Sequence, residues 1–160
     1  MIEEEQYGRL IEPLLRQAAG YARSILRDRH QAQDAVQQAA LRGLERIRTF
    51  DETRPFKGWW FAILRNCCMD MFRDRRTAKI VSLEHIDPPA AVPDDTSDWE
   101  RLSACMLLLS ADHQEILRLK YFADLSYREL ADALSIPQGT VMSRLHSARN
   151  ALASKMRKEE

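Results

Sequence analysis

Short polar side chains line one face of a predicted helix between positions 138 and 150. At about 100° per residue, Ser143, His146, Ser147 and Asn150 fall together, with Met142 beside them. Serine, asparagine and histidine can exchange hydrogen bonds with base edges, and methionine can contact a thymine methyl group. The pattern therefore indicates a helix whose outer face could enter the major groove of a DNA duplex.

Two short helices joined by a tight turn would position this face. Ser126 and Glu129 have the spacing of a capping box, which predicts a helix from there to about Leu134. Pro137 suits the first turn of a second helix, because its missing N–H would be unpaired there in any case. The inner faces would be formed by Leu130, Ala131, Leu134, Ile136, Val141 and Leu145. This is helix-turn-helix spacing, although it also fits an ordinary amphipathic helix pair, and the pattern alone leaves both interpretations open.

Basic residues and a glycine accompany the polar face. Arg128, Arg144 and Arg149 could hold phosphates, which fix a protein on a duplex without reading its sequence. Gly139 lies in the first turn of the second helix, where a bare backbone can come close to a phosphate at the positive end of the helix.

A second candidate lies in an earlier helix. Apolar residues recur there at steps of three and four, and a basic run from Arg73 to Arg76 follows them. The apolar residues are Phe56, Trp59, Trp60, Ile63, Leu64 and Cys67. Aromatic side chains beside cations suit single-stranded nucleic acid, since stacking contributes about 1–3 kcal/mol per base. Taken alone, such a stripe is more often part of a core.

Charge is unevenly distributed along the 160 residues, although the net charge is zero. Residues 1–80 hold 15 basic and 11 acidic side chains, residues 81–112 hold 1 and 7, and residues 113–160 hold 8 and 6. The acidic segment also contains Pro88, Pro89 and Pro93, a composition that cannot bury much apolar surface. We therefore predict an all-α chain of two small helical domains, 1–80 and 101–160, joined by an acidic flexible linker at 81–100.

Several classes of protein are disfavoured by the sequence. The longest bulky apolar stretch, Trp59 to Leu64, is far shorter than the roughly 20 residues of a membrane span, so we expect no membrane insertion. The acidic N-terminus lacks a signal-peptide pattern, which predicts a cytoplasmic protein. Cys67, Cys68 and Cys105 suit reduced thiols, whose redox role the sequence leaves open. We see no nucleophile motif, metal cluster or phosphate loop, and expect neither an enzyme nor a cofactor or metal.

The C-terminal motif resembles a known family. Leu125 to Ala131, together with Ile136 to Arg149, resembles region 4 of the extracytoplasmic-function (ECF) sigma factors, group IV of the sigma-70 family. The resemblance implies a helix-turn-helix that reads the minus-35 promoter element. Its implied DNA-binding residues are Arg128, Gly139, Thr140, Met142, Ser143, Arg144, His146, Ser147 and Arg149. Ser147 departs from the arginine that the family often has there.

The N-terminal half resembles the other conserved region of the same family. Asp34 to Arg42 resembles region 2.2, and Trp59 to Asp70, after the loop from Phe50 to Pro55, resembles regions 2.3 and 2.4. The implied polymerase-binding residues, outward at helical spacing, are Asp34, Gln37, Gln38 and Leu41. The implied minus-10 residues are Phe50, Arg54, Trp59, Ile63, Asn66 and Arg73. Without the resemblance, the outward residues of the first stretch would read as a solvated polar face.

The two resemblances together imply an alternative sigma factor that acts at the nucleoid. It would bind core RNA polymerase through the beta-prime clamp helices and the beta flap, recognise promoter DNA, and be controlled by an anti-sigma factor. It would not require a homo-oligomer. One alternative is a sigma-like decoy that sequesters an anti-sigma factor, as the departures at Ser147, Gln38 and Ala39 suggest. A helix-turn-helix repressor is a further alternative, but we find no dimerisation element for it.

Overall fold

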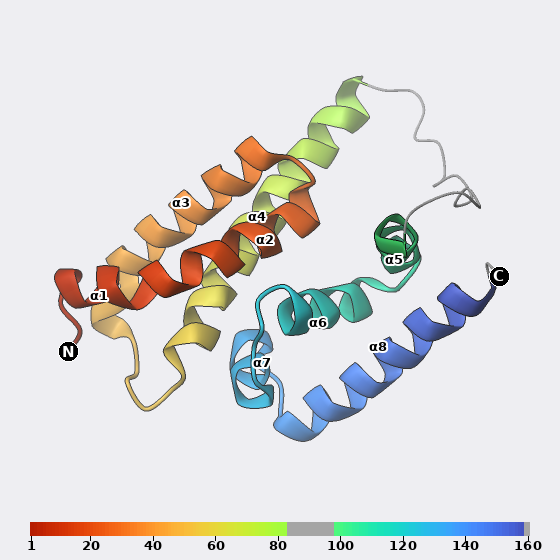
Figure 1. Cartoon of the computed structure of the whole chain (residues 1–160). Coiled ribbons are helices and arrows are strands. Elements are labelled where there is room, and N and C mark those ends of the chain that lie inside the picture. Colours follow the sequence, from red (N-terminus) through yellow and green to blue (C-terminus); the bar gives the residue numbers. More distant parts are fainter. Residues whose placement is uncertain (83–97, 159–160) are drawn as a thin grey trace.

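All regular structure in the described part of the chain is helical, as predicted. The computed structural model describes residues 1–82 and 98–158. The N-terminal module contains α1 (Glu4–Ile11), η1 (Glu12–Leu14), α2 (Leu15–Leu26), α3 (Arg29–Arg46), η2 (Ile47–Thr49) and α4 (Phe56–Ser82). The C-terminal module contains α5 (Asp98–Leu107), α6 (Ala111–Tyr121), α7 (Tyr127–Leu134) and α8 (Gln138–Lys158). Figure 1 shows α7 beside the first turns of α4, where the two modules meet.

The helix ends follow from short polar caps in the sequence. Asp28 accepts a hydrogen bond from the Gln31 amide (2.9 Å) at the start of α3. The predicted capping box is confirmed, since Ser126 Oγ accepts from the Glu129 amide (3.2 Å) and Glu129 Oε2 accepts from the Ser126 amide (2.7 Å). α7 then ends at Leu134, as predicted, and Ser135 adopts a left-handed conformation (φ 53°) that turns the chain toward α8.

The N-terminal core is built around the inner face of α4. Trp60, Phe61 and Leu64 are fully buried, and the Phe61 ring packs edge-to-face on Tyr21 of α2. The Trp60 indole donates a hydrogen bond to the Tyr7 hydroxyl (3.0 Å), which donates in turn to the Ala40 carbonyl (2.7 Å). Trp60 and Phe61 therefore belong mainly to the core, which is the commoner use of an aromatic stripe.

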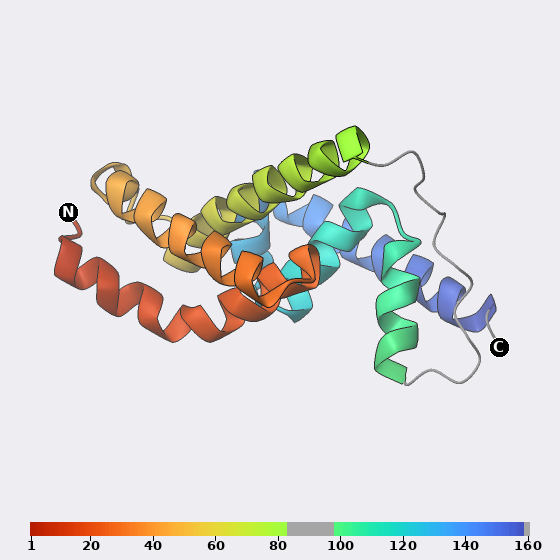
Figure 2. The same cartoon turned by 90° about the horizontal axis from the view of Figure 1, so that it is seen from above.

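The two modules share one continuous apolar cluster. Leu130, Val141, Leu145 and Ala148 are buried at the α7–α8 contact, which confirms the predicted helix-turn-helix packing. Packing between α4 and α7 and between α2 and α6 then joins this cluster to the N-terminal core. In Figure 2, seen from above, α2 and α6 cross near the middle of the molecule. We call this mutual packing of the modules the closed arrangement.

The predicted acidic linker falls mostly outside the described residues. α4 continues to Ser82 and α5 begins at Asp98, so both helices extend into the range 81–100. Residues 83–97 lie outside the described part of the chain, and the predicted domain bounds stay predictions. Within residues 1–82 and 98–158, no helix combines the length and apolar character needed to cross a membrane. The same residues contain no cluster of His, Cys, Asp and Glu suited to a metal ion.

Replacing Gly43 with alanine should destabilise the N-terminal module. A Cβ at this position would collide with the Tyr7 hydroxyl and lie 3.3 Å from the Trp60 ring, so the Tyr7–Trp60 hydrogen bond would have to shift. We expect Gly43→Ala to lower the free energy of unfolding by about 1–3 kcal/mol in urea denaturation. Gly8→Ala is the matched control, because a Cβ there meets nothing within 4 Å and should leave stability equal or higher.

The buried thiols of α4 should resist modification in the folded chain. Burial raises the pKa of the Cys67 thiol and raises that of Cys68 to about 12. Both should therefore react with a disulfide reagent at neutral pH only as fast as the protein unfolds, and rapidly in guanidinium chloride. These thiols stay protonated to a higher pH in the folded chain than in the unfolded chain. The free energy of unfolding should therefore fall as the pH rises above the ordinary thiol range. Rapid reaction of either thiol in the native protein would contradict this placement.

Candidate nucleic-acid interface

The outer face of α8 is exposed over most of the predicted reading surface, whereas Thr140 and Arg144 are half-buried. Met142 is 57% exposed, and its neighbours on this face are also exposed. These neighbours are Gly139, Ser143, His146, Ser147, Arg149 and Asn150. The Ser143 hydroxyl donates to the Thr140 carbonyl (3.1 Å), and the Asn150 amide lies 3.1 Å from His146 Nε2. The face is therefore accessible, with three of its side chains oriented by contacts within the helix.

Two of the predicted phosphate-binding arginines have defined partners. Arg149 Nε donates to the Tyr121 hydroxyl (2.7 Å), and its guanidinium lies 5.7 Å from the centre of the Tyr121 ring. Arg128 Nη2 donates to the Thr53 carbonyl in the N-terminal module (3.2 Å). Arg149 thus remains on the α8 surface, whereas Arg128 contributes to the closed arrangement. Tyr121 was not singled out from the sequence, because its link to Arg149 spans two helices.

The loop from Phe50 to Pro55 is held by an aromatic cluster and by its own hydrogen bonds. The Phe50 ring packs at 4.8 Å from Trp59 and at 5.6 Å from Phe56. Asp51 Oδ1 accepts from the Thr53 hydroxyl (2.6 Å) and amide (3.0 Å), and these bonds lower the pKa of Asp51. The loop is thus preformed, with Phe50 and Trp59 partly exposed beside it.

The other predicted minus-10 residues are placed unevenly. Asn66 is exposed, and Arg73 is exposed in an ion pair with Asp70 (2.5 Å). Ile63, in contrast, is only 5% exposed, so a base could not contact it in this arrangement. Arg54 forms an ion pair with Asp132 of α7 (2.7 Å) and is also committed to the closed arrangement. The structure therefore brings together Phe50 and Trp59, pairs Arg54 with α7 and does not expose Ile63.

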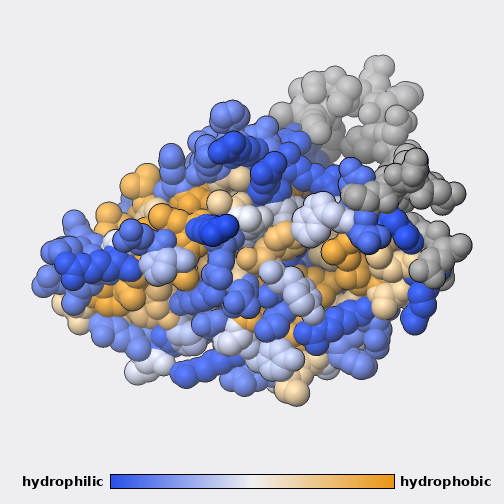
Figure 3. Space-filling model, viewed as in Figure 1, coloured by the Kyte–Doolittle hydropathy of each residue, from blue (hydrophilic) through white to orange (hydrophobic). Residues whose placement is uncertain are grey.

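The outward face of α3 carries the predicted polymerase-binding residues. Asp34, Gln37 and Gln38 are exposed, and Leu41 is 63% exposed. Figure 3 shows apolar side chains reaching the surface at the end of the molecule where α1 and α3 lie. One exposed leucine is unremarkable by itself. Here it lies beside exposed apolar surface at the same end of the molecule, which is typical of a surface that a partner covers.

Contacts between the modules were not anticipated from the sequence. Gly58 packs so closely on α7 that a Cβ would lie 2.8 Å from the Glu129 carbonyl oxygen. Arg65 of α4 pairs with Glu115 of α6, and Lys57 donates to the Asp124 carbonyl (3.0 Å). These pairs are at least 50 positions apart along the chain, and no local pattern marks them. Together with Arg54–Asp132 and Arg128–Thr53, they join α4 and the loop before it to the C-terminal module.

This geometry defines a two-module helical protein with a helix-turn-helix, and comparisons with known proteins specify its family. The Sigma-70 region 2 model matches residues 10–78, and the Sigma-70, region 4 model matches residues 99–152. The ECF RNA polymerase sigma factor SigL of Mycobacterium tuberculosis is 32% identical over 138 residues, covering 82% of this chain and 78% of SigL. SigW of Bacillus subtilis is 29% identical, covering 80% of this chain and 76% of SigW.

Solved structures agree with this assignment. The sigma factor RpoE of Bartonella quintana, crystallised with the anti-sigma factor NepR, matches with a TM-score of 0.73 and 25% identity over 96% of this chain and 98% of RpoE. CnrH in complex with the cytosolic domain of CnrY shares the fold, with a TM-score of 0.75 and 23% identity over 99% of this chain and 92% of CnrH. The chain belongs to the sigma-70 family and is an alternative sigma factor of the ECF group.

Proposed function

We propose that this sigma factor binds core RNA polymerase through the exposed face of α3 and directs it to a promoter with two recognition elements. The observation that carries the proposal is the accessible polar face of α8, in a chain whose family is established. Asp34, Gln37, Gln38 and Leu41 would contact the beta-prime clamp helices, and the C-terminal module would contact the beta flap. Bases of the minus-35 element would be read by Met142, Ser143, His146 and Ser147.

The minus-10 element would be captured by the preformed loop after η2. A base flipped from the duplex costs a few kcal/mol of lost stacking and pairing. Phe50 and Trp59 offer aromatic surface to replace the stacking, and Asn66 offers an edge hydrogen bond. Arg54 and Arg73 would hold the backbone of the opened strand. Ile63 would support the pocket from beneath, since it is buried.

The closed arrangement should keep the free chain from engaging both elements. Arg54 and Arg128, one from each DNA-binding module, are occupied by Asp132 and the Thr53 carbonyl. A promoter places its two elements far apart on the duplex, so the minus-10 loop and the helix-turn-helix must separate. We infer that core polymerase holds the modules apart, and that two weak DNA contacts then gain affinity by acting on one scaffold.

Control of this chain should come from an anti-sigma factor in the cytoplasm. RpoE, which shares its fold, was solved with the anti-sigma factor NepR. An anti-sigma factor that favours the closed arrangement would prevent promoter recognition without altering a DNA-facing side chain. Co-purification from native cells should therefore recover an anti-sigma factor as well as polymerase, and recovery of polymerase alone would contradict this inference.

In vitro transcription tests the function as a whole. Purified chain, core polymerase and a promoter library should give transcripts whose templates share two spaced elements. A sigma-like decoy would give no transcript from any template, although it would still bind an anti-sigma factor. A repressor would bind duplex DNA without polymerase and reduce transcription from it.

Removing the Arg149 side chain should weaken promoter binding without changing sequence preference. Holoenzyme with Arg149→Ala should lose the same affinity on every template, whatever its minus-35 bases. The plot of log association constant against log salt concentration should become shallower by about one. His146→Ala should instead relax preference at one base pair, a change of about 1–3 kcal/mol. Arg157→Ala, an exposed arginine near the end of the same helix, is the matched control. Equal effects of Arg149→Ala and Arg157→Ala in filter-binding titrations would contradict the assignment.

Replacing Gly58 with alanine should open the closed arrangement. The new Cβ would press on the Glu129 backbone, which cannot give way as a flexible side chain would. Free Gly58→Ala chain should therefore bind promoter DNA several-fold more tightly than the unmodified chain, measured by fluorescence anisotropy. Asp132→Asn, which removes the Arg54 ion pair without adding bulk, should change affinity in the same direction. Gly8→Ala is the control, and natively folded variants with unchanged affinity would refute the proposed occlusion.

A further inference from the structure

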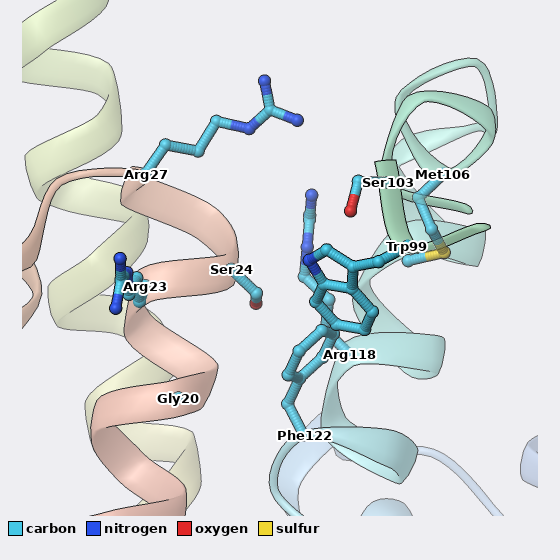
Figure 4. A pocket seen from close by; sticks show the side chains of 9 residues that line it. All are labelled: Gly20, Arg23, Ser24, Arg27, Trp99, Ser103, Met106, Arg118 and Phe122. Carbon is cyan, nitrogen blue, oxygen red and sulfur yellow. The ribbon is translucent and has the colours of Figure 1, made fainter. Parts of the chain in front are cut away.

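A cavity of about 640 Å³ lies between the two modules, on the opposite side of the interface from the minus-10 loop. One wall is the C-terminal half of α2, and the other is formed by α5 and α6, as Figure 4 shows. Its volume is in the range of sites that bind small organic ligands. None of the residues assigned to promoter or polymerase binding lines it.

Three arginine side chains surround this cavity without an acidic counterpart. Arg23 and Arg27 come from α2, and Arg118 comes from α6. In Figure 4, Arg27 extends from the end of α2 toward the opposite wall, and the Arg118 guanidinium rises between the two walls. No lining residue is acidic, and no ion pair or side-chain hydrogen bond joins these three guanidinium groups to another group in the described part of the chain.

This charge arrangement is costly unless an anion compensates it. Arg118 is partly buried, and burial lowers the pKa of its guanidinium, with a further contribution in that direction from the charge of Arg27. Removing a cation from water while a like charge faces it is unfavourable. Elsewhere in this interface the partly buried arginine, Arg65, is paired with Glu115. Within the described part of the chain, Arg118 therefore lacks the acidic partner that Arg65 has.

The remaining walls offer an aromatic face and hydroxyl groups. Trp99 is 60% exposed, and its ring packs edge-to-face on Phe122 with centroids 5.9 Å apart. Figure 4 shows the Ser24 and Ser103 hydroxyl groups on facing walls of the cavity. An exposed indole supported by a second ring is a surface on which a planar base can stack, and arginines nearby suit phosphate groups.

We propose that this cavity binds a nucleotide, whose phosphates contact Arg23, Arg27 and Arg118 and whose base stacks on Trp99. Guanidinium groups bind phosphate oxygens in a planar, paired geometry that lysine cannot supply. A bound nucleotide would contact α2 of one module and α5 and α6 of the other. It would therefore stabilise the closed arrangement, and its binding does not depend on the assignment of the promoter contacts.

Calorimetric titration of the full chain tests the site. ATP should bind saturably, AMP about tenfold more weakly because it brings fewer phosphate contacts, and pyrophosphate more weakly than ATP because it cannot stack. Arg27→Gln and Arg118→Gln should each weaken ATP binding about tenfold. Trp99→Ala should weaken ATP binding and leave pyrophosphate binding unchanged. Saturating ATP should also raise the thermal midpoint of the unmodified chain.

Matched controls make the result decisive. Arg16→Gln removes an exposed arginine from α2 outside the cavity and should leave ATP binding unchanged. Arg27→Gln keeps the test valid if Arg118→Gln fails to fold, because the Arg27 side chain is exposed at the C-terminal end of α2. Absence of saturable ATP binding at millimolar concentration would overturn the proposal. Equal binding of pyrophosphate and ATP would overturn the base-stacking part, and binding of an oligoglutamate peptide in preference to ATP would show a protein-docking surface instead.

Discussion

The close approach of α4 to α7 at Gly58 is the constraint on which the rest of the structure depends. Because Gly58 has no side chain, the first turn of α4 can rest on the backbone of Glu129. That contact positions the Arg54–Asp132 ion pair and the Arg128–Thr53 hydrogen bond on either side of it. The loop from Phe50 to Pro55 and α7 are thus packed against each other, although the residues that pair across this contact lie 75 and 78 positions apart.

The closed arrangement leaves two helix faces exposed and occupies two arginines. The reading face of α8 and the outward face of α3 stay exposed in the closed arrangement, so each module keeps its recognition surface. In the closed arrangement Arg54 and Arg128 pair with groups of the protein, which opposes the DNA contacts proposed for them. Exposed ion pairs contribute little on their own, typically about 0–1 kcal/mol, and Arg54 is nearly half exposed. These ion pairs therefore contribute less to the closed arrangement than the apolar packing of α4 on α7, which a polymerase interface would have to replace.

Much of the fold could be predicted from local signals. The capping box at Ser126, the period of Val141 and Leu145, and the outward set from Asp34 to Leu41 each follow from geometry within one or two helices. Those signals were sufficient for the two short helices and for the placement of the exposed faces, and the resemblance to region 4 favoured a helix-turn-helix over an ordinary helix pair. The resemblance to region 2 added the roles of the loop and of α4, which an aromatic stripe alone would have assigned mainly to a core.

The contacts between modules could not be predicted in the same way. Arg54 and Asp132 lie 78 positions apart, and nothing in either neighbourhood marks them as partners. Ile63 shows the same limit, because the resemblance assigned it to the minus-10 pocket although it is only 5% exposed. The arginines of the α2–α6 cavity were likewise scattered in sequence. Pairings of this kind depend on how helices cross, which one-dimensional periodicity does not specify.

The separation of the modules in solution tests the central claim most directly. Spin labels attached at Gln33→Cys on α3 and Ala153→Cys on α8 occupy exposed positions outside the recognition faces, and the native thiols are buried. Double electron–electron resonance should give a single short distance distribution for the free chain. On addition of core polymerase and promoter DNA, the account predicts a shift of that distribution to longer distances. An unchanged distribution in a transcription-competent complex would contradict it.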